Sequence, residues 1–461
     1  MIEKLVILGA GGDLTARYLL PALARLLEAE RLPPGFSVLG VGREPAGNED
    51  FRTRMTERLV RHAPDVSPST RNQLVARLVY GQADVTDAKQ MARLLRSADE
   101  SLLAYLALPP AIYAPTIEAL CDAGLAPGSR LVIEKPFGRD LESAQALNHL
   151  IAERLGEQTV FRIDHFLGMQ TVQNILGLRF ANRVFETLWN AVHVERVEIV
   201  WDETLALEGR AGYYDATGAL LDMIQNHLLQ LLGLVAMEPP QSLNARDLRD
   251  RKVDVLRAVR RFGPNEVDYY TRRARYGAGE IGGRPVGAYT HEPGVDPQRG
   301  TETFAEVTLF VDNWRWAGVP FVLRSGKALA RDRCEIAIHF RPVPHLAFEE
   351  NAAVPNVLRL NFEPERIALA LNITGPGERF ELRETVLDSP LNAPASDAYS
   401  RLLLDALQGD CTLAIRGDEA EEAWRIVEPI IRAWEAGRAP LAEYPAGTHE
   451  PGTSDPAVEE P

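Results

Sequence analysis

Short apolar runs alternate with helical stretches through the first third of this chain. The runs LVIL (5–8), FSVLGVG (36–42), SLLAYLAL (101–108) and RLVIEKP (130–136) predict buried strands. The stretch from Leu14 to Glu30, between the first two runs, predicts a helix. Strands that alternate with helices form parallel sheets, because the connections must cross the faces of the sheet. This part of the chain is therefore predicted to be a doubly wound, Rossmann-like α/β domain.

From about residue 190 the pattern changes to longer alternating runs, among them VERVEIVWDE, TFAEVTLFVDN, CEIAIHF and VLRLNFE. Such alternation is typical of an antiparallel sheet with one covered face, so a large α+β domain is expected. A chain of 461 residues also exceeds what one core usually absorbs. We predict a first domain at 1–175, a second at 176–447 and a disordered, acidic, Pro- and Gly-rich tail at 448–461, with the domain boundary inside 160–190.

Composition excludes several classes of protein. The net charge of −15, with no basic block, argues against nucleic acid as a partner. No apolar run reaches the roughly 18 to 20 residues of a membrane span, and the chain opens directly into a strand, so a cytoplasmic protein is expected. Cys121, Cys334 and Cys411 lie far apart, which predicts neither disulfides nor a metal site.

A glycine turn follows the first predicted strand. Gly9 and Gly12 in ILGAGGDL stand where backbone N–H groups and a helix N-terminus receive a pyrophosphate, although Leu14 replaces the third glycine of the usual pattern. After the second strand, Arg43 suits a 2′-phosphate and Glu44 suits a free 2′-hydroxyl. The residues therefore predict a dinucleotide site and leave NADP and NAD both open.

The segment 218–237 is apolar almost all round, which predicts a buried helix. Asp222, Asn226 and His227 interrupt it, and buried polar groups need partners. One explanation is a core histidine satisfied by a carboxylate; the other is a catalytic base.

Two further polar clusters favour the catalytic explanation. Lys135 follows one predicted strand, and Asp164 with His165 follows the next. A lysine, a carboxylate and a histidine at strand ends and on a buried helix can supply a general base with its orienting acid.

Long motifs throughout the chain resemble the glucose-6-phosphate dehydrogenase family. They run in order from residue 5 to about 447: GAGGDLTARYLLPAL, LALPPAIY, VIEKPFG, RIDHFLG, EGRAGYYDATGALLDMIQNHLLQ, TETFAEV, DNWRWAGVPFVLRSGK and DAYSRLLLDALQGDCTL. The resemblance implies a dinucleotide-binding domain followed by an antiparallel-sheet α+β domain, with assembly into homodimers or homotetramers. It also implies NADP or NAD as cofactor and a small sugar as substrate.

The resemblance assigns roles to individual residues. His227 matches the base that removes the C1 hydroxyl proton, Asp164 the carboxylate that orients it, and Lys135 a lysine between cofactor and sugar. Glu203, Asp222 and Lys327 match residues that hold sugar hydroxyls. The matches to cofactor contacts are Gly9, Gly12, Asp13, Leu14, Arg43, Tyr113 and Lys135.

The sequence departs from the family at the end of the sugar that carries the phosphate. Where the family reads RIDHYLGK, this chain keeps His165 but has Phe166 for the tyrosine and Met169 for the lysine. Asp332 stands where the family has a cation, and Glu363 where it often has glutamine. Losing two charge-assisted contacts costs about 3 to 6 kcal/mol of phosphate binding. Beside the cofactor, Tyr18 also replaces a family lysine.

Three functions follow from these observations. The first is an NAD(P)-dependent hexose C1 dehydrogenase that forms a lactone from a sugar without the 6-phosphate. The second is an ordinary glucose-6-phosphate 1-dehydrogenase whose phosphate meets other basic residues, such as Arg331 or Arg333. The third is a catalytically silent, cofactor-binding regulatory subunit.

Overall fold

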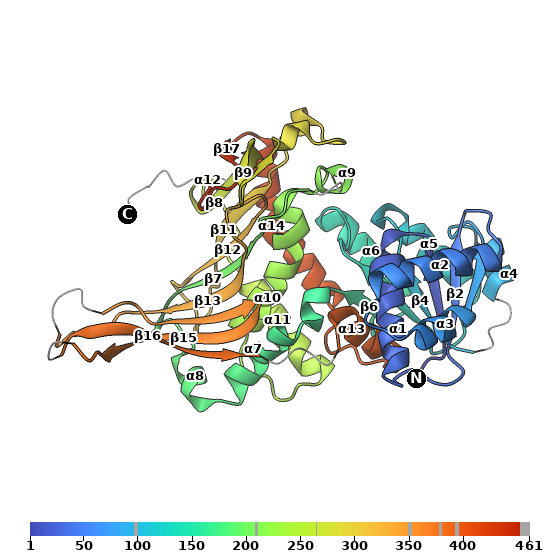
Figure 1. The fold of residues 1–461 in the computed structure, drawn as a ribbon, viewed down its shortest axis with the longest axis horizontal. Helices are drawn as coiled ribbons and strands as arrows, with labels where there is room; N and C mark the ends of the chain where they lie inside the picture. The colour runs from blue at the N-terminus through green and yellow to red at the C-terminus, as the bar shows by residue number, and fades with distance from the viewer. Residues whose placement is uncertain are drawn as a thin grey trace. The chain divides into compact units, whose positions relative to one another are not determined.

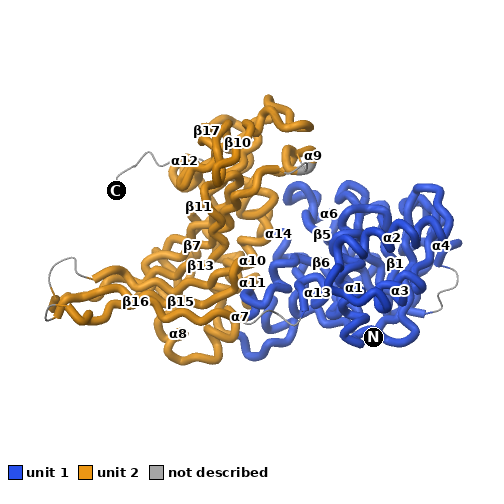
Figure 2. Tube along the Cα trace, viewed as in Figure 1, with its two compact units in different colours: residues 1–173, 240–250, 394–421 blue, residues 174–239, 251–393, 422–461 orange. Residues whose placement is uncertain are grey.

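A computed structural model describes residues 1–95, 100–207, 211–263, 265–348, 353–377, 380–391 and 396–451. Two compact units divide the chain (Figure 2). The first contains residues 1–173, 240–250 and 394–421, and the second contains 174–239, 251–393 and 422–461. The first unit thus includes two segments from far along the chain. The predicted division into two continuous domains, 1–175 and 176–447, does not place these segments in the first domain. Most of the tail predicted to be disordered, from residue 452 on, lies outside the described residues.

The first unit is built on a parallel sheet of six strands in the order β3-β2-β1-β4-β5-β6. This is the strand order of a Rossmann fold, as predicted. Four strands match the predicted runs, with β1 beginning one residue earlier than expected. Strand β4 is buried at every position because helices cover both faces of the sheet. The strands are β1 (Lys4–Leu8), β2 (Ser37–Gly42), β3 (Leu78–Gln82), β4 (Leu102–Leu106), β5 (Arg130–Glu134) and β6 (Val160–Ile163).

Helices of the first unit connect these strands (Figure 1). The predicted helix from Leu14 to Glu30 is present as a π-helical turn, η1, followed by α1. The helices and helical turns are η1 (Thr15–Leu19), α1 (Leu20–Glu28), α2 (Asn48–His62), α3 (Pro68–Ala76), α4 (Ala88–Leu95), η2 (Pro110–Ile112), α5 (Tyr113–Asp122), α6 (Leu141–Arg154), η3 (Glu157–Thr159), η4 (His165–Gly168) and α13 (Ala398–Gln408).

Helix α13 joins the first unit although it lies more than 200 residues from the sheet in sequence. Its leucines Leu402, Leu403 and Leu407 are buried in the same core as the strands and α1. The N–H of Ile2 donates to the carbonyl of Leu407 at 2.9 Å, which ties the start of the chain to the end of this helix. Apolar burial, together with this backbone bond, holds α13 in place.

The second unit is built on a sheet of nine strands in the order β16-β15-β14-β13-β7-β12-β11-β8-β17. Most neighbours are antiparallel, as predicted, but β7 pairs with β12 and β8 pairs with β17 in parallel. The strands are β7 (Val194–Asp202), β8 (Thr271–Gly277), β11 (Phe304–Phe310), β12 (Pro320–Gly326), β13 (Arg333–Phe340), β14 (Val357–Phe362), β15 (Glu365–Thr374), β16 (Leu382–Pro390) and β17 (Leu441–Pro445), with a separate hairpin of β9 (Gly279–Ile281) and β10 (Arg284–Val286).

The predicted buried helix at 218–237 is confirmed as two consecutive elements, η5 and α10, of which η5 packs against β7 and β12. Three helices, α7, α11 and α14, contain residues of both units. The remaining helical elements are α7 (Gln170–Phe180), α8 (Arg183–Leu188), α9 (Ala211–Tyr214), η5 (Leu220–Leu228), α10 (Leu229–Ala236), α11 (Ala245–Ala258), α12 (Val267–Tyr270), η6 (Tyr289–His291), η7 (Pro297–Arg299) and α14 (Gly417–Glu435). Among the described helices, none combines the length and the hydropathy needed to cross a bilayer.

Candidate active site

The glycine turn of the first unit joins β1 to η1. Gly9 has a φ of +92°, and a Cβ there would lie 2.1 Å from the carbonyl oxygen of Ala107, so only glycine fits. The N–H of Gly12 donates to the carbonyl of Gly9 at 3.0 Å and closes the turn. Arg58, on α2, donates to the carbonyl of Gly11 at 2.9 Å and adds a positive charge beside the turn. A tight backbone cradle at a helix N-terminus, with a cation beside it, fits a pyrophosphate.

Other residues predicted to contact the cofactor lie next to the glycine turn and directly after β2. Leu14 immediately precedes η1, and Asp13 is exposed and pairs with Arg17 at 3.3 Å. Arg43 and Glu44 follow β2 and are both exposed. The Glu44 carboxylate lies 3.0 Å from a guanidinium nitrogen of Arg54 on α2, so the acid that suits a free 2′-hydroxyl is already engaged in an ion pair.

A buried carboxyl group lies at the end of β5, beside Lys135. Glu134 accepts a hydrogen bond from the hydroxyl of Tyr105, and burial raises the pKa of Glu134 to about 7. The hydroxyl of Tyr113 donates to the backbone carbonyl of Glu134 at 3.1 Å. Tyr113, predicted to contact cofactor, is itself buried, so in the structure its hydroxyl anchors the strand end that carries Lys135.

Asp164 and His165 follow β6, as predicted. Asp164 caps the turn η4, because its carboxylate accepts the N–H of Phe166 at 2.9 Å. The ring of His165 stacks on Tyr399 of α13, with centroids 5.7 Å apart and planes inclined by 11°. Tyr399 in turn stacks on Tyr18 at 5.0 Å. The first unit therefore holds His165 in a stack of three rings.

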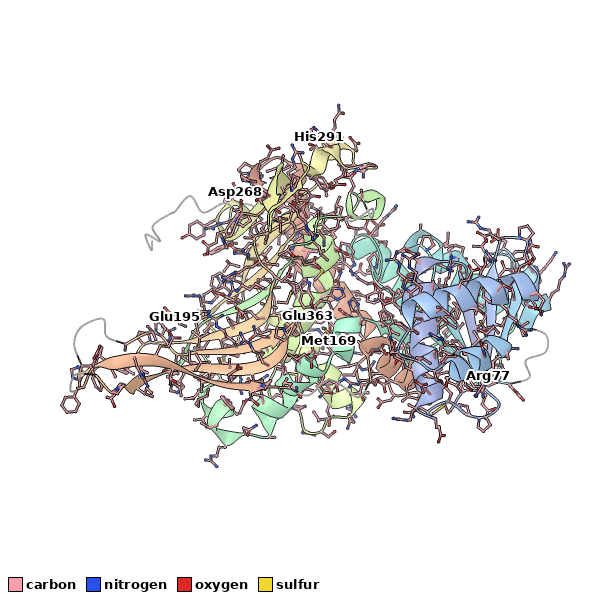
Figure 3. All side chains as sticks on the ribbon, in the orientation of Figure 1. Arg77, Met169, Glu195, Asp268, His291 and Glu363 are labelled. Carbon is pink, nitrogen blue, oxygen red and sulfur yellow. The ribbon has the colours of Figure 1, made fainter. Side chains whose placement is uncertain are left out.

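Phe166 and Met169 complete this turn. Phe166 is buried and lies edge-on to His165, with centroids 5.1 Å apart. Met169 is half-buried at the end of η4 and is labelled in Figure 3. The turn therefore carries an aromatic ring and a thioether, and neither side chain is charged.

In the second unit, η5 carries Asp222 and His227. On an α-helix, residues five apart point about 140° away from each other, because one turn takes 3.6 residues. A π-helix bonds residue i to i+5, so residues five apart lie on the same side of the helix. The π geometry of η5 therefore places Asp222 and His227 on one side of the helix. π-Helical turns occur frequently at functional sites.

The side chain of Asn226 supports the backbone around His227. Its amide oxygen accepts the N–H of His227 at 2.6 Å, and its amide nitrogen donates to the carbonyl of Leu221 at 2.9 Å. The backbone of the predicted base is thus fixed by its neighbour. Asp164 and His227 belong to different units, and their pairing stays a prediction.

Lys327 and Glu203 meet at the ends of two parallel strands, β12 and β7. The Lys327 ammonium lies 2.5 Å from the Glu203 carboxylate and 5.4 Å from the centre of the Tyr214 ring. Tyr214 is buried, and this burial is the main reason that its pKa lies well above the usual value. The negative charges of Asp222 and Glu302 raise the pKa further. The second unit thus gathers the three residues predicted to hold sugar hydroxyls, Glu203, Asp222 and Lys327, around Tyr214.

Two of the residues predicted at the phosphate end, Asp332 and Glu363, lie in the second unit. Asp332 is exposed and accepts the N–H of Thr204 at 2.6 Å, and Glu363 is exposed at the turn between β14 and β15 (Figure 3). The thiol of the nearby Cys334 has a raised pKa, chiefly because of burial and then because of the charges of Glu363, Glu203 and Asp332. The negative charges of these three carboxylates therefore all affect the Cys334 thiol, in one region of the second unit.

Arg333, named above as a possible phosphate ligand, is engaged by carboxylates of the sheet. Its guanidinium pairs with Glu198 and lies 2.8 Å from the carboxylate of Glu335, so its charge is balanced on the sheet. Arg331 is exposed.

Some residues at the site were not singled out from the sequence. Glu302 and Tyr399 stand in motifs that carry the family resemblance, TETFAEV and DAYSRLLLD, which was the available signal. Tyr214 and Glu134 likewise stand in such motifs, EGRAGYYDATGALLDMIQNHLLQ and VIEKPFG, whereas Tyr105 and Arg58 gave no signal of their own, since their contacts are made across strands and helices far apart in sequence.

Family comparisons cover nearly the whole chain. The family described as "Glucose-6-phosphate dehydrogenase, NAD binding domain" matches residues 6–174, and "Glucose-6-phosphate dehydrogenase, C-terminal domain" matches residues 176–461. A glucose-6-phosphate 1-dehydrogenase of Treponema pallidum is 42% identical over 478 residues, which cover 98% of this chain and 93% of the relative. The enzyme of that name from Zymomonas mobilis is 39% identical over 472 residues, covering 98% and 96%.

Solved structures agree with these relatives. Glucose-6-phosphate 1-dehydrogenase from Mycobacterium avium superposes with a TM-score of 0.85 at 35% identity, covering 98% of this chain and 96% of the other. A glucose-6-phosphate dehydrogenase in complex with its substrate glucose-6-phosphate gives a TM-score of 0.89 at 32% identity, with the same coverage.

One unit of the chain is Rossmann-like with a glycine turn after its first strand, and the other is a mixed-sheet unit that carries a buried histidine, an acid and a lysine–glutamate pair; these features define an NAD(P)-dependent oxidoreductase. The chain belongs to the glucose-6-phosphate dehydrogenase family. It is accordingly an NAD(P)-dependent sugar 1-dehydrogenase rather than a catalytically silent subunit.

Proposed function

We propose that this enzyme oxidises glucose 6-phosphate at C1 to the lactone. In this reaction the C1 hydroxyl loses a proton and C1 loses a hydride, for which bound NAD(P) supplies the acceptor. The observation that carries the proposal is the placement of Asp222 and His227 on one side of η5, in the unit where Lys327 pairs with Glu203. Relatives at about 40% identity that carry the name glucose-6-phosphate 1-dehydrogenase support this sugar.

His227 is proposed as the general base. A neutral imidazole within reach of the C1 hydroxyl takes its proton as hydride leaves. Asp164 is proposed to orient that imidazole, and Lys135 to lie between the cofactor and the sugar. Lys327, Glu203 and Asp222 are proposed to hold sugar hydroxyls, because buried charged groups discriminate strongly against a sugar that lacks a partner hydroxyl.

The residues of the first unit fit NAD(P) as the cofactor. The glycine turn with Arg58 beside it suits the pyrophosphate. Because Glu44 is paired with Arg54, a 2′-phosphate beside Arg43 would meet two cations rather than an unpaired acid. We therefore propose that NADP is accepted at least as well as NAD.

A second candidate substrate is a hexose without the 6-phosphate, and specific observations favour it. Phe166 and Met169 offer no cation, the charge of Arg333 is balanced by glutamates, and Asp332 and Glu363 add negative charge. A phosphate desolvated there would lack charge-assisted hydrogen bonds. A hydroxyl or an amine at C6 could instead be held by a carboxylate.

One kinetic comparison separates the two candidates. The measurement is kcat/KM for glucose 6-phosphate, glucose and glucosamine, with NAD and with NADP, followed by absorbance of the reduced cofactor. A preference for glucose 6-phosphate above about tenfold, roughly 1.4 kcal/mol, supports the first substrate. The converse preference, reversed in a Phe166→Tyr, Met169→Lys, Asp332→Arg variant, supports the second. Turnover of none of the three sugars would contradict both.

Assembly into a homodimer or homotetramer is also proposed. The hairpin of β15 and β16 forms one edge of the nine-stranded sheet and exposes the apolar side chains of Ile373, Val386 and Leu387. Exposed apolar side chains on an edge hairpin are typical of an interface. Sedimentation velocity would give the mass, and Val386→Lys with Leu387→Lys should shift it toward the monomer.

A further inference from the structure

A short segment just before β11, Thr301 to Thr303, contacts both η5 and Lys327, which are proposed to serve sugar binding. It follows the turn η7 and contains one buried acid, Glu302. Its first residue, Thr301, donates its hydroxyl to the carbonyl of Asp215 at 2.7 Å. The segment therefore begins anchored to the loop that leads into η5.

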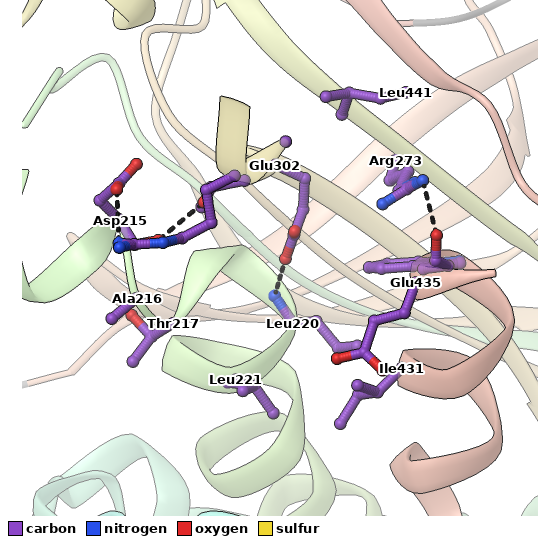
Figure 4. A pocket seen from close by; sticks show the side chains of 14 residues that line it. Asp215, Ala216, Thr217, Leu220, Leu221, Arg273, Glu302, Ile431, Glu435 and Leu441 are labelled. Atoms are coloured by element: carbon purple, nitrogen blue, oxygen red, sulfur yellow. Dashed lines mark hydrogen bonds and ion pairs between the residues drawn. The ribbon is translucent and has the colours of Figure 1, made fainter. Parts of the chain in front are cut away.

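The carboxylate of Glu302 binds the first turn of η5. It accepts the N–H of Leu220 at 3.0 Å (Figure 4). The backbone carbonyl of Glu302 accepts the N–H of Ala219 at 3.2 Å. The first N–H groups of a helix have no partner within the helix, so an acceptor outside it must satisfy them. Glu302 satisfies two consecutive ones and thereby fixes where η5 starts.

Gly218 gives Glu302 the room to do this. The residue has a φ of +65°, and a Cβ built on it would lie 2.3 Å from the Glu302 carboxylate. Both the backbone conformation and the close approach require glycine. Glu302 also lines a cavity of about 310 Å³, together with Leu220 and Arg273 (Figure 4).

Thr303 extends the same segment to the other sugar-binding group. Its carbonyl accepts the N–H of Lys327 at 2.9 Å, and its hydroxyl accepts the N–H of Tyr276 at 2.9 Å. One backbone segment therefore sets the position of η5, with Asp222 and His227, and that of Lys327. A change in this segment moves one group relative to the other.

We propose that Glu302 is a positioning residue for sugar oxidation. It holds η5 in the position at which Asp222 and His227 face the sugar that Lys327 binds. Glu302 acts through the backbone N–H groups at the start of η5 and does not touch the reacting atoms. This inference rests on the proposed function for its catalytic consequence, but not for its effect on the helix.

The test compares two substitutions of similar size. Glu302→Gln keeps an amide oxygen that can accept the N–H of Leu220, whereas Glu302→Met fills the space without an acceptor. The Met variant should raise the KM for the sugar and lower kcat, together reducing kcat/KM by about 30-fold or more, with the KM for the cofactor within threefold of the parent. The Gln variant should keep kcat, the KM for the sugar and the KM for the cofactor within threefold of the parent.

Glu306→Met is the matched control. Glu306 lies four residues further on, in β11, and its carboxylate pairs with Arg272 at 3.8 Å. The Glu306→Met variant should keep kcat and both KM values within twofold of the parent. A folded Glu302→Met enzyme with unchanged kcat/KM overturns the inference, and so does an equal loss in Glu302→Gln, because the acceptor is then not what matters.

A second variant covers the case in which Glu302→Met does not fold. Gly218→Ala displaces the Glu302 carboxylate without altering it, and should give the same rise in sugar KM with little change in cofactor KM. An unchanged sugar KM there also overturns the inference. Hydrogen exchange of peptides from residues 218–228 adds a readout that needs no turnover: amide exchange should be about tenfold faster in Gly218→Ala. If the parent oxidises no sugar but this exchange responds, the proposed function fails while the role of Glu302 in placing η5 stands.

Discussion

The ammonium of Lys327 lies 2.5 Å from the carboxylate of Glu203, and the two residues follow directly on the ends of strands that pair in parallel. Both side chains are largely buried, so each charge depends on the other. In the proposed role of this pair, a sugar hydroxyl beside the two groups would meet a donor and an acceptor already in place, which lowers the cost of ordering the site when the sugar binds.

Lys327→Met should therefore weaken sugar binding far more than cofactor binding. The substitution leaves the Glu203 carboxylate without its cation, and we expect the KM for the sugar to rise by about 10- to 100-fold. Steady-state kinetics with each ligand varied in turn would measure this. The matched control is Lys89→Met, because Lys89 is exposed on α4 in the other unit. A cofactor KM that rises as much as the sugar KM would show that Lys327 serves the fold rather than the sugar.

His227→Asn should lower kcat by about 10²- to 10⁴-fold, since a positioned base contributes that much to a proton transfer. Cofactor binding, followed by fluorescence titration, should change by less than threefold. His149→Asn, on the exposed face of α6, is the control for the loss of a histidine. Turnover near that of the parent in His227→Asn would remove His227 from the role of base.

Arg43→Ala should discriminate between the two cofactors. An arginine beside the ribose interacts with a 2′-phosphate through charge-assisted bonds, which a free hydroxyl does not gain, so the KM for NADP should rise by about tenfold more than the KM for NAD. Arg61→Ala, on the exposed side of α2, controls for the loss of a surface charge. Equal changes for both cofactors would place Arg43 away from the adenosine ribose.

Glu134 should make the stability of the protein depend on pH. Its pKa in the folded protein is about 7, raised by burial from an ordinary 4.5. A carboxyl with a raised folded pKa binds its proton more tightly when folded. Below about pH 4.5 the group therefore has no effect on the free energy of unfolding. As the pH rises to 7 it destabilises the protein progressively, and above pH 7 it lowers the free energy of unfolding by up to about 3 kcal/mol.

Glu134→Gln removes this titration and keeps an acceptor for Tyr105. Relative to the parent, the variant should gain stability as the pH is raised from 4.5 to 8, as measured by urea unfolding at several pH values. Glu142→Gln, at an exposed position of α6, should show no such trend. A stability difference between Glu134→Gln and the parent that stays constant across this range would mean that Glu134 is ionised throughout it.

The sequence alone determined the features that depend on local pattern. Four apolar runs and a glycine turn predicted the parallel sheet and the cradle between β1 and η1, because strand periodicity and the steric freedom of glycine are properties of a few neighbouring residues. The placement of Lys135 at a strand end followed from the last of these runs, and that of Asp164 and His165 from a further strand expected directly before them.

Only the tertiary structure decided how residues far apart in sequence meet. Five-residue spacing separates Asp222 from His227 on an ordinary helix, and it is the π geometry of η5 that aligns them. The capping of η5 by Glu302, some 80 residues further on, and the burial of α13 in the core of the first unit leave no local signature. Hydrogen bonds and apolar contacts across such distances form only when whole elements pack, so no window of neighbouring residues encodes them.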